Sequence, residues 1–430
     1  MSTAVENDVD LSDIHLFDIE TLIDPWEAYT RLRDNAPVFF VPEMNIHVVT
    51  RYDLLMQAAR DTETFSSGFG EFLNGARMQY FNAAPPEVQA ELVKASEGMF
   101  APVDTLLTAD MPTHKKYRSQ VDRVFTAGNV RKMEPYINEI IKDTIDAFID
   151  ADGPVDFMQA FAFPVPLRII GDRLGVEPED REFFNDAATV AAAGLRLTMP
   201  DHQEGIRRAK VMVQLQNYMV NLVHKRREDP KNDMATILGQ VELEDEKRPL
   251  NDPELWSIMN QFLVAGHETT TSTFGWGMLE LCKHPEVQEE IRGDKKMVRT
   301  FVEEALRLEA PVQGLPRVVT KDTELGGYPL KAGDLIMLRY GAANRDERQF
   351  ECPVDLDVHR KNAGSQLAFG TGIHHCVGAP LARQELNLGF PALLDRMKNF
   401  RLAPGKPAPK AEPSFILRNL PELWIEFDRR

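Results

Sequence analysis

Cysteine is scarce in this chain of 430 residues, which has only Cys282, Cys352 and Cys376. An odd number of widely spaced cysteines excludes a disulfide framework as the basis of the fold. No hydrophobic run reaches the roughly 20 residues needed to span a bilayer. The first 20 residues are acidic and polar, whereas a secretory signal is basic and then apolar. We therefore expect a cytoplasmic protein with reduced thiols and no membrane segment.

Positive charge is also in short supply, with 49 Lys and Arg against 67 Asp and Glu and a net charge of −18. This balance argues against binding to nucleic acid. The chain has no internal repeat, low-complexity tract or Gly/Ser linker. Its length allows one to three domains, and the lack of linkers favours one. We predict a single domain over residues 1–430, with residues 1–20 as a flexible N-terminal segment.

Helical periodicity dominates what is present. Apolar residues recur every three or four positions in 134–152, 206–227 and 253–284. Strand candidates are short and lie towards the two ends of the chain, at 45–50, 323–327, 334–339 and 423–427. We predict a mainly α protein with small β-sheets.

The stretch FGTGIHHCVG, residues 369–378, places Cys376 in a loop before a helix candidate. A buried structural thiol, a zinc ligand, a nucleophile and a thiolate ligand of iron are the alternatives. A zinc site would need a second Cys/His pair at finger spacing, and a nucleophile would need a base. The sequence identifies neither. Three glycines would let the backbone pass close under a flat ligand, and the helix N–H groups would point at the sulfur. The neighbours favour an iron ligand. These glycines are Gly370, Gly372 and Gly378.

This stretch resembles the haem-binding loop of the cytochrome P450 monooxygenases almost letter for letter. The resemblance implies haem b as cofactor, with Cys376 as the thiolate ligand, Phe369 packed against the sulfur and Gly378 beside it. It also implies the cytochrome P450 fold, a single triangular domain with the haem between this loop and a long helix. The expected activity inserts one atom of O₂ into an organic substrate.

A second stretch, LVAGHETTTS at 263–272, lies in the longest helical segment. It resembles the oxygen-binding helix of the family. Gly266 is expected to leave room for a ligand, and Thr269 to bond the carbonyl of Ala265, which bends a helix. The resemblance makes Glu268 and Thr269 a catalytic proton relay. His267 is expected to be a bystander.

A third stretch, FVEEALRLEAP at 301–311, places Glu304 and Arg307 on one helical face. The resemblance makes this a structural pair behind the haem loop. Its usual third partner is an arginine in a Pro-x-Arg-Phe-like stretch. Residues 353–356 read Pro-Val-Asp-Leu here, so that arginine is missing.

The resemblance also assigns cations to the two haem propionates. His114 and Arg118, in the stretch 110–126, match the helix that binds one propionate, and Arg317 matches the other propionate arginine. His374 is placed to assist. Arginine suits this role because its planar guanidinium meets a carboxylate with two hydrogen bonds.

By the same resemblance, a mostly apolar set of residues and the segment 195–199 line the substrate pocket. We therefore predict a small neutral hydrophobic substrate, an aromatic or terpenoid compound that is hydroxylated or O-dealkylated. The pocket residues are Phe81, Phe262, Val264, Val312, Leu315 and Phe415.

No flavin or nicotinamide domain is evident, so electrons are expected from a ferredoxin and its NAD(P)H-dependent reductase. Residues 114–132 hold six Lys or Arg against one acid, Asp122, and include Lys116 and Arg123. A charge run is usually a solvated helix face, but the family places this helix where an acidic ferredoxin docks. The protein is expected to be a monomer. A peroxide-driven enzyme of the same fold and a non-catalytic haem carrier or sensor are the alternative functions.

Overall fold

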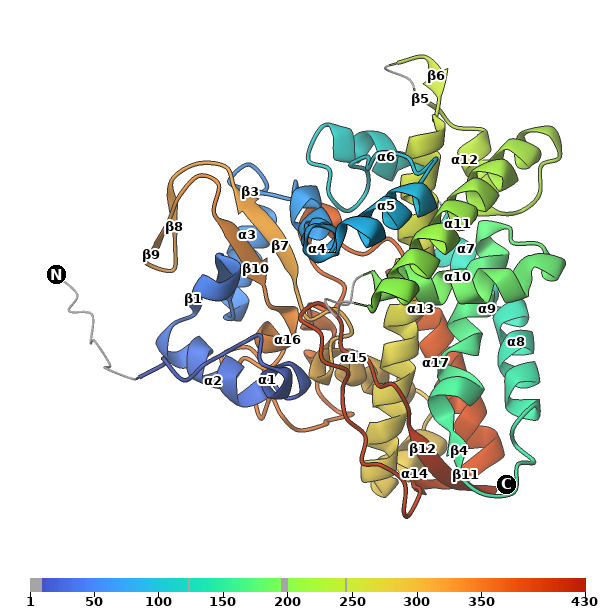
Figure 1. The fold of residues 1–430 in the computed structure, drawn as a ribbon. Coiled ribbons are helices and arrows are strands. Elements are labelled where there is room, and N and C mark those ends of the chain that lie inside the picture. The colour runs from blue at the N-terminus through green and yellow to red at the C-terminus, as the bar shows by residue number, and fades with distance from the viewer. Residues whose placement is uncertain (1–9, 123, 195–199, 244–245) are drawn as a thin grey trace.

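The computed structural model describes residues 10–122, 124–194, 200–243 and 246–430. Figure 1 shows a wedge of helices on one side and the largest sheet, with the N-terminal helices, on the other. The predicted mainly α class with small sheets is confirmed. The predictions on the segment 195–199 and on Arg123 fall outside the described residues.

Five long helices frame the centre of the molecule: α9 (Pro164–Leu174), α11 (His202–Glu228), α13 (Asp252–Lys283), α15 (Met297–Leu308) and α17 (Ala379–Arg396). The others are α1 (Ile19–Ile23), α2 (Trp26–Asn35), α3 (Tyr52–Arg60), α4 (Gly70–Ala83), α5 (Pro86–Ala95), α6 (Thr113–Val121), α7 (Ala127–Lys132), α8 (Glu134–Asp146), α10 (Arg181–Ala193), α12 (Met234–Gly239), α14 (Pro285–Gly293) and α16 (Tyr340–Ala343). The periodic segments 206–227 and 253–284 match α11 and α13 closely, and 134–152 begins as predicted but ends at Asp146.

Helix α13 is the central rod of the fold, and its sequence explains both of its ends. Asn251 caps the first turn and receives the Glu254 backbone N–H, while the Glu254 side chain accepts the Asn251 backbone N–H. Pro253 suits that first turn because its nitrogen has no hydrogen to donate. The helix ends at Lys283, two residues before Pro285. Figure 1 shows α13 in yellow running alongside α17.

The largest sheet has five strands in the order β1 (Val38–Val41), β2 (Ile46–Val49), β10 (Leu335–Leu338), β7 (Leu315–Val319) and β3 (Phe65–Ser66). A second sheet pairs β11 (Met397–Leu402), β12 (Trp424–Arg429) and β4 (Val155–Asp156). Two hairpins are β5 (Glu242–Leu243) with β6 (Arg248–Pro249) and β8 (Thr323–Leu325) with β9 (Tyr328–Leu330). The four predicted strands correspond to β2, β8, β10 and β12. The other described strands, β1, β3, β4, β5, β6, β7, β9 and β11, were not predicted.

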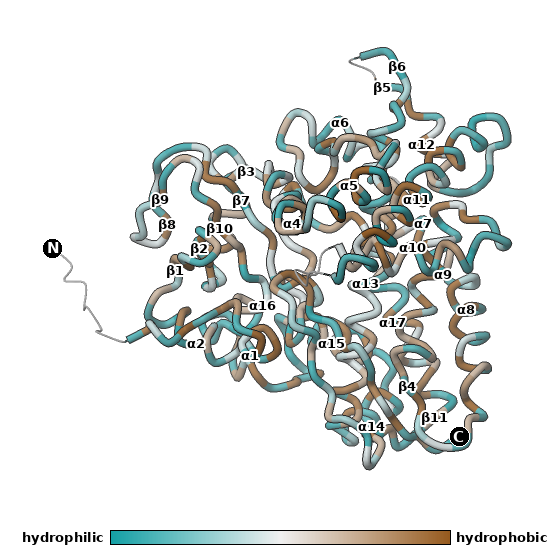
Figure 2. The backbone as a smooth tube through the Cα atoms, in the orientation of Figure 1, coloured by the Kyte–Doolittle hydropathy of each residue, from teal (hydrophilic) through white to brown (hydrophobic). Residues whose placement is uncertain are grey.

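The main core lies among the helices, around α9, α13 and α17, and two smaller clusters lie on either face of the largest sheet. In Figure 2 the peripheral β5–β6 hairpin is mainly hydrophilic, while hydrophobic stretches recur along the packed helices. Within the described residues, no helix is both long enough and apolar enough to cross a membrane.

The prediction of a flexible segment up to residue 20 extends too far. Ile14 and Leu16 are buried against Tyr29 and Leu32 of α2. The Arg31 guanidinium donates to both carboxylate oxygens of Asp13, at 2.7 and 2.8 Å. This part of the N-terminal segment therefore belongs to the packed body of the protein.

Candidate active site

The loop before α17 holds Cys376 by backbone geometry. Gly370 and Gly372 have φ angles of +65° and +71°, in the left-handed region that favours glycine. The Cys376 backbone N–H donates to the carbonyl of Phe369 at 2.9 Å and closes the loop. A Cβ at Gly378 would lie 3.8 Å from the Cys376 sulfur, so the backbone passes close to it. The loop thus presents the thiol at the first turn of a long helix.

The surroundings of Cys376 act in opposite directions on its acidity. Burial is the larger effect and raises the pKa of the thiol, while hydrogen bonds from the backbone N–H of Gly378 and of Ala379 and the charges of Arg118 and Arg383 oppose that rise. Amide hydrogens at a helix start and nearby guanidinium groups favour the thiolate over the thiol. The donor set therefore suits a cysteine that binds a cation as a thiolate.

Helix α15 supports this loop through a residue that the sequence analysis did not single out. Glu303 is buried and accepts from Arg383 Nε at 2.6 Å and from Gln366 Nε2 at 3.0 Å. The Arg383 guanidinium in turn lies over the Phe369 ring, 4.3 Å from its centroid. The sequence signal for this role is the Glu303-Glu304 doublet. Both of these acids are buried on α15.

Three predicted cofactor-binding residues come together and leave nitrogen atoms without partners. The rings of His114 and His374 have centroids 4.3 Å apart. Burial, then the charges of Arg317 and His114, lower the pKa of His374 to about 3. Among the described residues, no partner exists for the buried His114 Nε2, His374 Nε2 or Arg317 Nε. Buried polar atoms without partners are rare and costly, so this cluster fits an anionic group that a ligand brings.

Arg118 is occupied differently from the prediction. Its Nε donates to Asp122, one helical turn further along α6. Its charge nevertheless lowers the pKa of Cys376, of His114 and of His374. Arg118 thus contributes positive potential to the site while its guanidinium is partly neutralised.

On α13, the predicted bond of Thr269 is confirmed, and Gly266 has a packing role that the sequence did not predict. The Thr269 hydroxyl donates to the carbonyl of Ala265 at 2.9 Å. A Cβ at Gly266 would lie 2.7 Å from Ile170 of α9. The glycine is therefore required by close packing of two helices, because any side chain there would collide with α9. Ala265, one position before it, is exposed in the middle of the helix.

Glu268 lies on a different face of α13 from Thr269. Its side chain is 7% exposed, and its Oε2 accepts from Nδ2 of Asn419 at 2.8 Å. Successive residues of a helix are about 100° apart, so Glu268 faces the segment before β12 whereas Thr269 faces Ala265. His267 Nδ1 lies 2.8 Å from the carbonyl of Leu263 within the same helix.

The Glu304–Arg307 pair is fully buried, and its third partner is Arg360. Arg307 donates to both oxygens of Glu304 at 2.6 and 2.9 Å. Arg360 Nε lies 3.0 Å from Glu304 Oε2. The missing arginine of residues 353–356 is thus replaced by one further along the chain, where Asp357-x-x-Arg360 was the available signal.

The predicted pocket residues divide into two groups. Phe415 is 1% exposed, with its ring 4.3 Å from that of Phe17 and beneath Arg339. Phe262 is buried and stacks on Phe125 at 5.5 Å. Both rings pack against other aromatic or cationic side chains of the core, so little of their surface is accessible. The half-buried members of the set are Phe81, Val264, Val312 and Leu315.

The cations of residues 114–132 differ in whether they form ion pairs with other residues. Lys116 is paired with Glu246 and lies 3.7 Å from Glu254, so it serves the packing of α6 against α13. Lys115, Arg131 and Lys132 are exposed and make no ion pair with any described residue.

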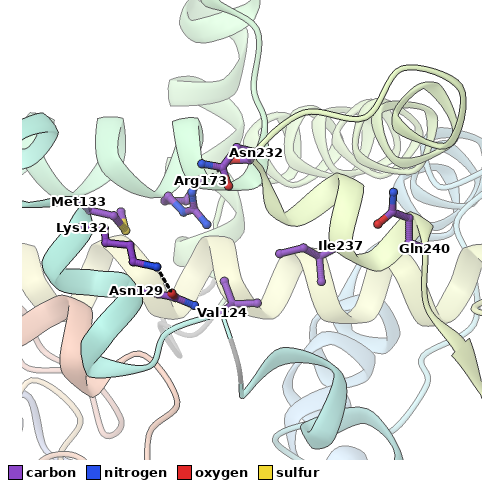
Figure 3. Close-up of a pocket in the computed structure, with 8 residues that line it drawn as sticks. All are labelled: Val124, Asn129, Lys132, Met133, Arg173, Asn232, Ile237 and Gln240. Atoms are coloured by element: carbon purple, nitrogen blue, oxygen red, sulfur yellow. Dashed lines mark hydrogen bonds between the residues drawn. The ribbon is translucent and has the colours of Figure 1, made fainter.

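A cavity of about 540 Å³ lies between α7, α9 and α12 (Figure 3). It shares no residue with the predicted site. Its lining residues are Val124, Asn129, Lys132, Met133, Arg173, Asn232, Ile237 and Gln240.

Comparison with known proteins identifies the class that this fold and loop define. The family model "Cytochrome P450" matches residues 82–425. Nocardicin C N-oxygenase of Nocardia uniformis is 36% identical over 75% of this chain and 80% of its own. Vitamin D(3) 25-hydroxylase of Pseudonocardia autotrophica is 31% identical over 95% and 94%. The crystal structure of the Tepidiphilus thermophilus P450 heme domain matches with a TM-score of 0.84 and 28% identity, over 96% of each chain.

The chain belongs to the cytochrome P450 family and is a monooxygenase with haem b as its cofactor. The observed residues fit that group. Haem b carries two propionates, and the buried nitrogen atoms of His114, His374 and Arg317 lack the acceptors that carboxylates provide.

Proposed function

We propose that this enzyme inserts one oxygen atom from O₂ into a small neutral hydrophobic substrate, with Cys376 as the thiolate ligand of the haem iron. The observation that carries the proposal is the position of the Cys376 sulfur against Gly378, at the start of α17. Backbone N–H groups and the Arg383 guanidinium stabilise negative charge on this sulfur. When bound, the thiolate-ligated iron supplies the activation of O₂.

His114, His374 and Arg317 are proposed to hold the propionates. Arg317 is 3% exposed and uses Nη1 on the carbonyl of Pro316, so its Nε remains for a ligand oxygen. Neutral imidazoles suit this environment, since burial, followed by the charge of Arg118, lowers the pKa of His114. Arg118 adds positive potential from α6.

Thr269 and Glu268 are proposed to deliver protons. The Thr269 hydroxyl bonds Ala265 with its own hydrogen, which leaves its oxygen as an acceptor on the exposed side of α13. Glu268, the acid one residue before Thr269, exchanges protons with water and passes them towards Thr269. The intact acid and hydroxyl favour an O₂-driven enzyme over a peroxide-driven one and over a carrier or sensor.

The half-buried Phe81, Val264, Val312 and Leu315 are proposed to contact the substrate. These side chains are apolar and uncharged, which favours a neutral aromatic or terpenoid compound. Hydroxylation and O-dealkylation both begin with removal of hydrogen from carbon, so either reaction fits. Among the relatives, one is named for hydroxylation of vitamin D(3).

Electrons are proposed to come from a ferredoxin and its NAD(P)H-dependent reductase. The exposed Lys115, Arg131 and Lys132 give α6 and α7 a positive surface in a chain of net charge −18. Such a surface attracts an acidic partner. Lys116 is not part of it because Glu246 neutralises it.

Cysteine replacement tests the ligand assignment. Cys376→Ser should abolish the thiolate-type Soret band of the reduced carbon-monoxide complex, and Cys376→His should give an imidazole-type spectrum with little oxygenation. Cys282 and Cys352 are the matched controls: burial raises the pKa of Cys282 to about 12, and Cys352 is exposed. Loss of the band in Cys282→Ser or Cys352→Ser, with retention in Cys376→Ser, would show the assignment to be wrong.

A further inference from the structure

The segment between β11 and β12 binds one face of α13 at three successive turns. Asn419 Nδ2 donates to Glu268, and the carbonyl of Arg418 accepts from the Ser272 hydroxyl and from Trp276 Nε1. Glu268, Ser272 and Trp276 are four residues apart, so they share a face of the helix. All five residues are buried.

The same segment is tied to the proposed substrate-contacting stretch. The Gln313 backbone N–H donates to the carbonyl of Ile416 at 2.7 Å, and the Arg418 N–H to that of Pro311 at 3.0 Å. Leu417 pairs with Val312 in an isolated β-bridge. Asn419 is therefore held in place by α13 and by residues 311–313, and its amide has little freedom to move away from Glu268.

The chemistry of an amide suits a carboxyl group that changes its protonation state. A carboxylate accepts hydrogen bonds only, whereas a protonated carboxyl also donates one. Asn419 offers Nδ2–H to Glu268, and its Oδ1 is buried with no partner among the described residues. A half-turn of the amide about its terminal bond exchanges donor and acceptor, so the side chain can bond Glu268 in either state.

We propose that Asn419 is a positioning residue for proton delivery, which holds Glu268 both as carboxylate and as carboxylic acid. The inference rests on the proposed relay. In each cycle Glu268 takes a proton from water and gives it up towards Thr269, and the Asn419 amide turns to match. A carboxyl group that is held in both protonation states is already in position for each proton transfer.

The test compares variants of the haem-loaded enzyme by two readouts. Asn419→Leu keeps the volume of the side chain and removes its hydrogen bonds. We expect it to lower product formed per NADH several-fold, with a matching rise in hydrogen peroxide, and to shift the infrared carboxyl band that disappears in Glu268→Gln. Since Asn419 acts through Glu268, the double variant should be no more uncoupled than Glu268→Gln alone.

Ser272→Ala is the matched control, because it removes a bond from the same segment one turn away and leaves Glu268 untouched. It should preserve both the product ratio and the infrared band. If Asn419→Leu does not retain haem, Asn419→Asp replaces it, since aspartate keeps the size but cannot donate when ionised.

Four outcomes would overturn the inference. One is a normal product ratio in Asn419→Leu alongside an uncoupled Glu268→Gln. Additive losses in the double variant, or an equal loss in Ser272→Ala, would show that Asn419 acts through loop packing. Normal coupling in Glu268→Gln would refute the proposed relay itself, and with it the role of Asn419.

Discussion

Two arginines of this protein, Arg307 and Arg317, are both buried, with 0% and 3% exposure, and differ in their partners. Arg307 donates to both oxygens of Glu304 and to the carbonyls of Asn344, Pro353 and Asp355. Arg317 donates to the carbonyl of Pro316 and contacts Tyr340, and its Nε has no partner among the described residues.

The difference separates a structural cation from a binding cation. A buried charge is tolerated when its hydrogen bonds are satisfied. Arg307 satisfies this condition within the chain, so its partners are already in place. Arg317 does not, and the two histidines beside it also have unpartnered nitrogen atoms. An anion from outside the chain would complete a cluster with this deficit, which is the role proposed above for the haem propionates.

The largest effect is expected from breaking the saturated cluster. Arg307→Ala removes two hydrogen bonds to Glu304 and three to backbone carbonyl groups in the core. We expect the free energy of unfolding in urea to fall by about 3–5 kcal/mol, the usual cost of removing one partner of a buried pair. As a control, Lys331→Ala breaks the exposed pair with Asp322 and should cost less than about 1 kcal/mol. Equal losses in the two variants would contradict the structural role of Arg307.

Arg317→Leu should affect haem retention without lowering the stability of the folded chain. It removes a buried cation with incomplete hydrogen bonding, so the stability of the haem-free protein should stay the same or rise. Haem dissociation, measured by transfer to a haem acceptor protein, should accelerate roughly 10- to 100-fold, because a hydrogen bond to a charged group contributes about 1.5–3 kcal/mol. Arg51→Leu, which breaks an exposed pair with Asp53, is the control and should leave haem retention unchanged.

The smallest effect is expected from the exposed cations of α6 and α7, which make no ion pair with a described residue. Lys115→Glu with Arg131→Glu should alter neither stability nor haem retention, since neither side chain makes an ion pair with a described residue. Reduction by ferredoxin at low salt should slow about tenfold, and the difference should vanish at high salt. The control is Lys321→Glu, which reverses the charge of an exposed lysine on another surface. An unchanged rate in the double variant would exclude this docking surface.

Local features of this molecule could be predicted from its sequence, and long-range ones could not. The Cys376 loop and α13 are specified by glycine positions, caps and periodicity within short stretches, and they were predicted closely. Arg360 as the partner of Glu304, and Asn419 as the partner of Glu268, depend on contacts between residues far apart in the chain. The packing role of Gly266 was missed for the same reason, because its neighbour Ile170 lies on another helix.

Strand prediction failed by the same rule. β7 owes its place in the sheet to β10 on one side and β3 on the other, and its own residues, which include Pro316, give a weak signal. Phe415 was assigned to the pocket by the family resemblance, and its contacts with Phe17 and Arg339 could not be predicted from the sequence. A single sequence does not reveal which apolar residues meet in the core.

The bond between Glu268 and Asn419 joins residues 151 positions apart, which has a consequence for how the protein is made. A ribosome adds about 5–20 residues per second, so roughly 8–30 s pass between synthesis of the acid and synthesis of its amide partner. During that interval α13 can form and pack on the elements already made, but Glu268 lacks the amide that fixes it. The proposed proton path is therefore completed late in translation, after the Cys376 loop has been synthesised.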